Sequence, residues 1–317
     1  MHRLLPAALA LAAVTSTVAS AQVVDRLNPI IAVQEKGQPV FGIAHPAIVR
    51  RAPRPGGPNG VAASAPAPAP QPAIVLSEVA KETMGYQRAD YLFTSASTDT
   101  FLKYLEEIRA AGGSARTHPF SSKIGIWHAD SAAVRRAIVR QLNAGLVNLS
   151  LEAVESPQEV RDVIEAMRFG KAGGTRPDTG LSAAAAYWGL SVAKYKQRAD
   201  VWPINKRGEL LLGVIIESVE GIARAREIAA EPGVGQVFVG FGTLGQVFRG
   251  DTAAREDAAA KILAACTAAK VPCGFPTNNP AEMERRYNEG WRVFIMQRRD
   301  EAGFGAVETG RKLGGRS

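Results

Sequence analysis

Short apolar stretches alternate with amphipathic helical segments along most of this chain. Eight stretches have the pattern of β-strands, at 40–44, 90–94, 123–127, 146–151, 210–216, 236–239, 271–275 and 292–296. The stretch at 210–216 is apolar without a break, as expected of a parallel strand buried on both faces. Regular strand–helix alternation over about 250 residues is typical of a single (β/α)8 TIM barrel, and a doubly wound open sheet is the alternative.

Helix-boundary signals support this alternation. The run Ser-Pro-Gln-Glu at 156–159 is a capping box with proline at the first helical position. Thr98 with Asp99 can cap the helix that follows the second strand, and Ser218 can cap the helix after 210–216. A further helix begins near Ser131 and ends at a glycine.

The first residues have the pattern of a secretory signal peptide. A short basic start is followed by an apolar stretch at 4–18, and Ala-Ser-Ala at 19–21 fits the small-residue cleavage pattern. The apolar stretch is shorter than the about 20 residues of a membrane span. We therefore predict a signal peptide at 1–21 and a secreted or periplasmic barrel at 22–317, with no membrane attachment after cleavage.

Residues 46–73 are rich in proline, alanine and glycine. Such a segment offers little apolar surface to bury, so we expect it to be disordered. The strand at 40–44 that precedes it is too short to form a domain alone. The segment is therefore predicted to be an insertion between strand 1 and helix 1 of the barrel.

Charge and cysteine content exclude several function classes. The formal net charge is +8 over 317 residues, and basic residues are interleaved with acidic ones. This pattern argues against a nucleic-acid partner and favours a small acidic metabolite. The two cysteines, Cys266 and Cys273, are too few for a zinc site. A disulfide between them is permitted in an oxidising compartment, and separate burial is the open alternative.

The run at 240–245 matches the G-x-G-x-x-G pattern of dinucleotide-binding proteins. That pattern also needs a helix opening at the third glycine and an acidic residue at the end of the next strand. Here a glycine at 250 soon interrupts the segment, and the strand at 271–275 carries no carboxylate. We predict no dinucleotide cofactor.

Chemistry in a TIM barrel lies at the carboxyl ends of the strands, where three side chains are candidates, and a fourth candidate lies in a loop after the fourth helix. Glu217 and Glu152 each end a predicted strand, and two converging carboxylates can hold a hard divalent ion. His128 follows the third strand as a possible acid–base group. Arg176 lies in a glycine-rich loop and could contact an oxyanion. For each, a structural or solvated role is the alternative.

Two segments, at 212–221 and 228–240, carry a resemblance to a known family. They contain a Glu-Ser pair after the strand and the pattern Ala-x-x-x-Gly-Val-x-x-x-Phe-x-Gly. The chain resembles the HpcH/HpaI aldolase/citrate lyase family over nearly all of the predicted mature chain, with further similar segments at 143–160 and 272–275 and a weaker one at 28–43. The resemblance implies a barrel of the phosphoenolpyruvate/pyruvate type, usually a homo-oligomer. It also implies metal-dependent carbon–carbon bond cleavage or formation through a pyruvate enolate.

Carried over by position, the family's functional residues match this chain only in part. Glu217 falls on the family's metal-binding glutamate, which implies Mg²⁺ or Mn²⁺ as cofactor. Thr243 stands where the family has the second metal ligand, an aspartate, and Ile215 stands where it has a glutamine. Residues 95–98 lack the family's histidine, and no arginine is evident in the third strand at 124–128.

Two functional hypotheses follow from this partial match. The first is a divergent exported carbon–carbon lyase or aldolase acting on 2-oxo or 2-hydroxy acids through a metal-stabilised enolate, with Glu152, His128 and Arg176 as a substitute set of site residues. The second is a non-catalytic barrel that binds an acidic metabolite or a protein partner. The loss of one metal carboxylate favours the second hypothesis, and the family resemblance favours the first.

Overall fold

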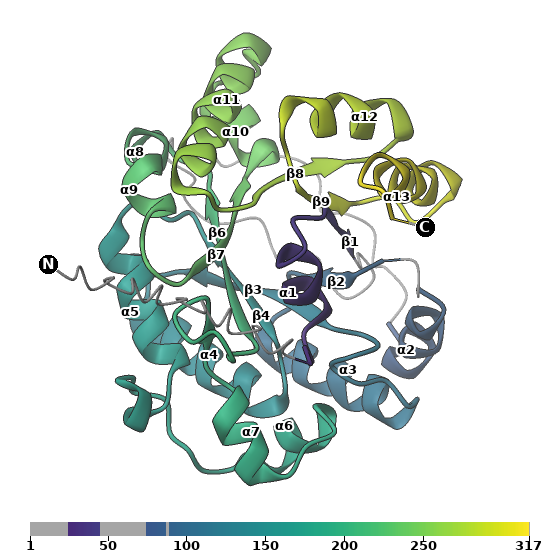
Figure 1. The fold of residues 1–317 in the computed structure, drawn as a ribbon, viewed down its shortest axis with the longest axis vertical. Helices are drawn as coiled ribbons and strands as arrows, with labels where there is room; N and C mark the ends of the chain where they lie inside the picture. Colours follow the sequence, from purple (N-terminus) through teal and green to yellow (C-terminus); the bar gives the residue numbers. More distant parts are fainter. Residues whose placement is uncertain (1–24, 45–73, 87–88, 317) are drawn as a thin grey trace, which may run out of the picture.

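The strands form a closed parallel barrel with helices around it, in a computed structural model that describes residues 25–44, 74–86 and 89–316 (Figure 1). Pairing runs β1-β2-β3-β4-β6-β7-β8-β9 and returns from β9 to β1. The barrel strands are β1 (Val40–Ala44), β2 (Tyr91–Thr94), β3 (Phe120–Ile126), β4 (Asn148–Glu152), β6 (Leu210–Ile216), β7 (Val234–Val239), β8 (Cys273–Thr277) and β9 (Val293–Met296). The predicted TIM barrel is confirmed, and the open sheet is excluded.

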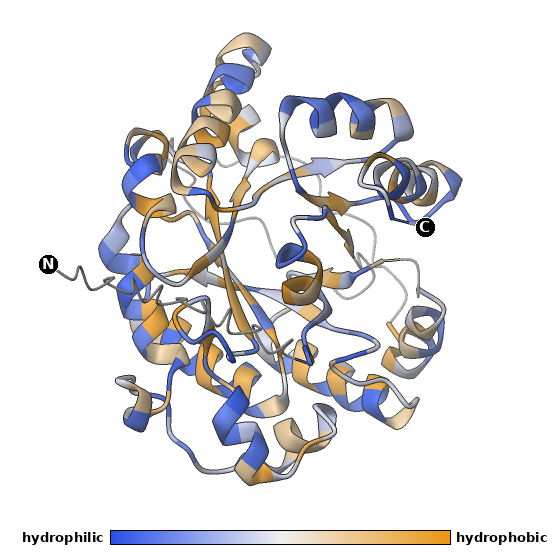
Figure 2. Ribbon diagram, in the orientation of Figure 1, coloured by the Kyte–Doolittle hydropathy of each residue, from blue (hydrophilic) through white to orange (hydrophobic). Residues whose placement is uncertain are grey.

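Helices follow the strands as the alternation predicts. They are α1 (Pro29–Gln34), α2 (Leu76–Met84), α3 (Thr98–Ala110), α4 (Ser131–Ala144), α5 (Pro157–Met167), α6 (Ser182–Tyr187), α7 (Val192–Arg198), α8 (Val219–Ala223), α9 (Ala225–Ala229), α10 (Phe241–Val247), α11 (Thr252–Ala269), α12 (Pro280–Glu289) and α13 (Glu301–Leu313). A two-residue strand, β5 (Val201–Trp202), pairs only with the start of β6. Figure 2 shows apolar residues concentrated on the barrel strands and on the helix faces turned toward them.

The predicted helix caps are present with one shift. Ser156 accepts a hydrogen bond from the Glu159 amide at 3.3 Å, and Ser218 accepts one from the Gly221 amide at 3.1 Å. At α3 the cap is Ser97, one residue before the predicted pair, and it accepts from the Thr100 amide at 3.2 Å. These caps fix the points at which the chain leaves a strand and enters a helix.

Polar side chains occupy part of the barrel interior. Ser121 on β3 and Ser150 on β4 are buried, and their hydroxyl oxygens lie 3.0 Å apart. Asn148 is also buried, and it accepts a hydrogen bond from the Asn28 side chain at 2.8 Å. Because these residues are polar, the apolar pattern placed the start of β3 three residues too late.

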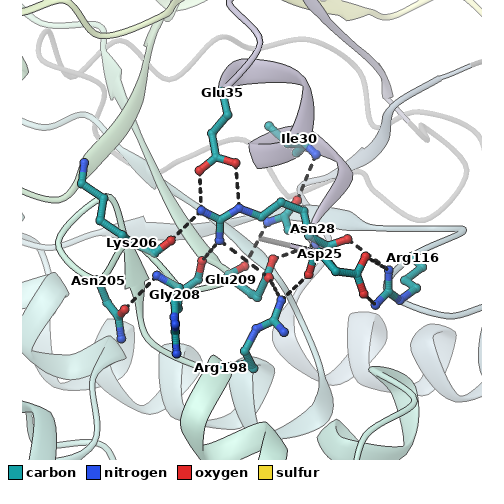
Figure 3. A network of polar contacts seen from close by, with 12 residues as sticks. Asp25, Asn28, Ile30, Glu35, Arg116, Arg198, Asn205, Lys206, Gly208 and Glu209 are labelled. Carbon is teal, nitrogen blue, oxygen red and sulfur yellow. Dashed lines mark hydrogen bonds and ion pairs between the residues drawn. The ribbon is translucent and has the colours of Figure 1, made fainter. Parts of the chain in front are cut away.

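The segment before β1 covers the amino-terminal end of the barrel. Ile30 and Ile31 on α1 pack inside the barrel against residues such as Leu211. Figure 3 shows the polar network beside them, which includes Glu209, whose side chain is 0% exposed. The Asn28 amide donates to Glu209 at 2.8 Å, and the guanidinium of Arg26 lies 3.7 Å from the same carboxylate. A cavity among the strand ends is found at the opposite, carboxyl end of the barrel.

Cys266 on α11 and Cys273 on β8 form a disulfide, which decides between the two open alternatives for these residues. The predicted signal peptide at 1–21 and insertion at 46–73 lie outside the described residues. Within the part of the chain that the structure describes, no helix has both the length and the apolar character needed to cross a bilayer.

Candidate active site at the barrel mouth

A cavity of about 180 Å³ lies at the carboxyl end of the barrel strands. Its wall is built by the last residues of several strands and by the first turn of α10. Most of this wall is apolar, formed by Phe93, Ile215, Phe238, Phe241 and Ile295. Such a wall limits the water around any polar group that faces the cavity, which strengthens electrostatic interactions with a bound ligand.

Glu217 faces this cavity from the end of β6. Its position is set locally, because Ser218 caps α8 and leaves the preceding residue at the end of the strand. Only 4% of Glu217 is exposed. Its side chain packs directly against Gly240, at which a Cβ atom would collide with it. Glycine at 240 is therefore required by the close approach of this carboxylate.

Thr243 lies on the wall of the same cavity, in the first turn of α10. The structure thus brings together the two positions that the family resemblance relates to metal binding. A threonine hydroxyl is neutral, so it does not replace the negative charge of an aspartate.

Lys123 is a site residue that the sequence reasoning did not identify. It lies on β3, lines the cavity, and its side chain is 26% exposed. Its ammonium nitrogen is 3.7 Å from a carboxylate oxygen of Glu152, the last residue of β4. Glu152 is 1% exposed and reaches the cavity through this ion pair. The available signal was a lysine at the centre of a strand whose neighbours are uncharged.

A bulge in β3 begins directly after Lys123. Lys123 is paired with Ser150 on β4, whereas Ile126 is paired with Glu152, so β3 carries one extra residue between these pairs. Gly125 supplies the left-handed backbone conformation there, with φ 105°. Bulges of this kind redirect side chains and are common beside active sites.

The other two predicted site residues lie elsewhere. His128 is half-exposed, and its ring nitrogens lie 3.5 Å from Glu159 and 3.9 Å from Glu155. Arg176 is 2% exposed, its guanidinium carbon lies 3.9 Å from the centre of the Phe169 ring, and burial lowers its pKa. Neither contributes to the wall around Glu217. The structure brings Glu152 to the mouth, through Lys123, but not His128 or Arg176.

Comparisons with known proteins show which sequences and folds this chain is similar to. No protein-family model matches the chain. A hydroxypyruvate/pyruvate aldolase from Delftia acidovorans (strain DSM 14801 / SPH-1) is 32% identical over 158 residues, which cover 49% of this chain and 55% of that protein. The chain thus matches about half the length of its curated relatives. Among solved structures, an HpcH/HpaI aldolase/citrate lyase family protein from Burkholderia cenocepacia J2315 gives a TM-score of 0.62 at 20% identity and covers 87% of this chain and 93% of that one.

The chain resembles the HpcH/HpaI aldolase/citrate lyase family. The resemblance predicted from two sequence segments is therefore confirmed by fold and by curated relatives. A more distant neighbour, the citrate lyase beta subunit from M. tuberculosis, was solved with oxaloacetate and magnesium. It gives a TM-score of 0.50 at 11% identity and covers 86% of this chain and 98% of that one.

The HpcH/HpaI resemblance implies a divalent metal, and the residues at the mouth can be compared with what such an ion requires. Glu217 is the one acidic side chain that the described residues place on the cavity wall. Within the same described ranges, no group of three or more His, Cys, Asp or Glu could hold a metal. Lys123 adds a positive charge to this wall, which opposes a second cation. The donor set that the described residues supply, one carboxylate beside a lysine, does not fit a resident divalent metal.

Proposed function

We propose that this protein is an exported carbon–carbon lyase or aldolase that acts on small 2-oxo acids at the barrel mouth. The observation that carries the proposal is the position of Glu217, which the family motif singles out and which faces the mouth cavity. The names of similar proteins, aldolases and lyases of the HpcH/HpaI family, support the same reaction class.

The mouth offers what an anionic 2-oxo acid requires. The ammonium of Lys123 attracts the substrate carboxylate, and the aromatic and aliphatic wall holds the carbon chain with few waters around it. The carboxylate of Glu217 faces the same space, so it can accept the proton of a substrate hydroxyl when the neighbouring carbon–carbon bond breaks. Lys123 lies on β3 and Glu217 directly follows β6, so both side chains are positioned by strands of the barrel.

A resident metal is not part of this proposal, because the donor set at the mouth does not fit one. Mg²⁺ is usually held by one or two carboxylates together with water and substrate oxygens. Weak binding that depends on Glu217 and on bound substrate is the most that these residues support. Titration of Mn²⁺ with and without pyruvate, on wild type and Glu217→Ala, measures this directly.

Export and self-association belong to the same proposal. The signal-peptide pattern at 1–21 supports export, and so does the disulfide, because disulfides persist in oxidising compartments and are rare in the cytosol. Homo-oligomer formation is proposed from the family resemblance alone. N-terminal sequencing of native protein from the periplasmic or secreted fraction should begin near Gln22, and recovery of Met1 in the cytoplasm would contradict export.

The activity is tested by pyruvate release from a panel of 4-hydroxy-2-oxo acids, with Glu217→Gln as the matched variant. We expect measurable turnover by wild type that the variant lacks. Thr243 stands where the family has an aspartate. This loss of an acidic side chain favours the second candidate, a barrel that binds an acidic metabolite without turnover. Saturable binding of pyruvate with no cleavage of any panel member would establish that candidate and exclude the lyase.

A further inference from the structure

We propose that Lys123 forms a covalent imine with the carbonyl carbon of the 2-oxo acid, so that a protonated lysine–substrate imine takes the place of a metal as the acceptor of electrons. This inference rests on the proposed function, because it concerns the same cavity and substrate class. It begins from the disagreement described above. A citrate lyase beta subunit of similar fold was solved with oxaloacetate and magnesium, but the described residues of this chain place one carboxylate and one lysine on the cavity wall.

The position of Lys123 is suited to nucleophilic chemistry. Its side chain lines the cavity that also contains Glu217, so its nitrogen can reach a molecule bound there. The bulge after Lys123, with Gly125 at φ 105°, sets the path of β3 at this point. A lysine amine in an apolar pocket is a usual nucleophile toward carbonyl compounds. The wall of this cavity, with three phenylalanines and two isoleucines, provides such a pocket.

A lysine nucleophile needs a partner that removes and returns a proton. Glu152 meets this need, since its carboxylate oxygen lies 3.7 Å from the Lys123 nitrogen and its side chain is almost fully buried. Glu152 lies at the end of the strand next to Lys123, so the pair is held by two adjacent barrel strands.

The first step forms the imine. Glu152 takes a proton from the ammonium, and the amine nitrogen attacks the carbonyl carbon, C2. The carbonyl oxygen takes one proton from the attacking nitrogen and one back from Glu152, and it leaves as water. The C2–N double bond that forms carries the positive charge that Lys123 had at the start, so charge and protons balance.

The second step breaks the carbon–carbon bond of a 4-hydroxy-2-oxo acid. The C3–C4 electron pair forms a C2–C3 double bond while the C2–N π electrons move to nitrogen. The proton of the C4 hydroxyl goes to Glu217, and the aldehyde leaves. Glu217 then returns the proton to C3, and water releases the 2-oxo acid and restores Lys123. Each residue on this path lines the cavity or contacts one that does.

Borohydride trapping tests the imine without requiring turnover. Mature protein is treated with EDTA, incubated with pyruvate and sodium borohydride, and analysed by peptide mass spectrometry. We expect one reduced pyruvate on the peptide that contains Lys123, at many times the level on the exposed Lys261, whose side chain is 63% exposed. Equal labelling of both lysines, or none at Lys123, would overturn the proposal.

Two variants separate covalent chemistry from charge. Lys123→Arg keeps a positive charge beside Glu152 but cannot form an imine, so we expect it to lose both the label and turnover while its melting temperature stays near that of wild type. Glu152→Gln keeps the amine and removes the proton acceptor, so we expect at least tenfold slower labelling that reaches the same final extent. Full turnover by Lys123→Arg would contradict the imine, whatever the affinity of that variant for pyruvate.

Failure of this inference can be distinguished from failure of the proposed function. Labelling at Lys123 without cleavage of any hydroxy-oxo acid would support the imine and contradict the lyase. Cleavage that needs added Mg²⁺ or Mn²⁺ and gives no label would contradict the imine and leave the lyase in place.

Discussion

The two ends of this barrel use charged residues in different ways. At the amino-terminal end, Glu209 is fully buried and is surrounded by donors from Asn28, Arg26 and Arg198 (Figure 3). At the carboxyl end, Glu217 and Lys123 lie on the wall of a cavity that is otherwise mostly apolar. The first arrangement buries its charges among partners within the protein, whereas the second places charged side chains on the wall of a cavity.

This difference separates the residues that stabilise the amino-terminal end of the barrel from those to which we assign the proposed chemistry. A buried carboxylate paired with guanidinium groups loses much stability if one partner is removed, because the remaining charges stay buried and unpaired. Groups that face a cavity contribute less to stability, and active sites often exchange stability for function. Substitutions at the carboxyl end should therefore lower activity more than stability. Substitutions at the amino-terminal end should lower stability more than activity.

The largest expected effect is on activity at the mouth. Glu217→Gln keeps the shape of the side chain and removes its capacity to accept a proton, so kcat should fall by about 10²-fold or more. The melting temperature should change by only a few degrees. A pyruvate-release assay beside thermal unfolding measures both quantities. A variant that loses stability and activity together would show that the mouth is structural, like the opposite end.

The next effect is on stability at the amino-terminal end. Glu209→Gln removes the charge that neutralises Arg26 and Arg198, and loss of one partner from a buried ion pair typically costs about 3–5 kcal/mol. Chemical denaturation should show this loss, with activity per folded molecule unchanged. Asp25→Asn is the control, because Asp25 forms an exposed ion pair with Arg116 and its substitution should leave stability unaltered.

A smaller effect is expected from the disulfide. It joins α11 to the start of β8 over a sequence separation of 7 residues. A disulfide that closes a loop of this length usually raises the free energy of unfolding by about 2–3 kcal/mol. The Cys266→Ser/Cys273→Ser variant should unfold at lower denaturant concentration and keep its turnover. Unchanged stability, together with free thiols in the untreated wild type, would show that the cysteines are buried separately.

The smallest expected effect is a pH dependence of stability at the amino-terminal end of the barrel. Hydrogen bonding to Arg26 lowers the pKa of Glu35, with burial acting in the opposite direction. A carboxyl group whose folded pKa is lowered contributes stability above its unfolded pKa of about 4.3, and this contribution is lost as pH falls through the folded value. Glu35→Gln should therefore be less stable than wild type at pH 7 and equally stable in acid. A constant difference at all pH values would contradict the assignment.

The sequence alone determined the architecture of this protein and one half of its site. Strand–helix periodicity is a local property, since each strand and helix must bury its own apolar face, and this predicted the barrel. The caps at Ser156 and Ser218 are equally local. Glu217 and Thr243 were related by matching motifs, and the parallel strands then brought them to one cavity.

Tertiary structure alone decided which other charged residues lie at the cavity. Lys123 became a site residue because a bulge sets its place on β3 and because the end of the next strand places Glu152 beside it, a contact between residues 29 positions apart. His128 and Arg176 were candidates of the same kind in the sequence, yet the fold directs them to other partners. The covering of the amino-terminal end likewise depends on a contact of Asn28 with Glu209, across 181 residues. Such long-range pairings leave no periodic signal, because they depend on strand register and on the direction in which each side chain leaves the barrel wall.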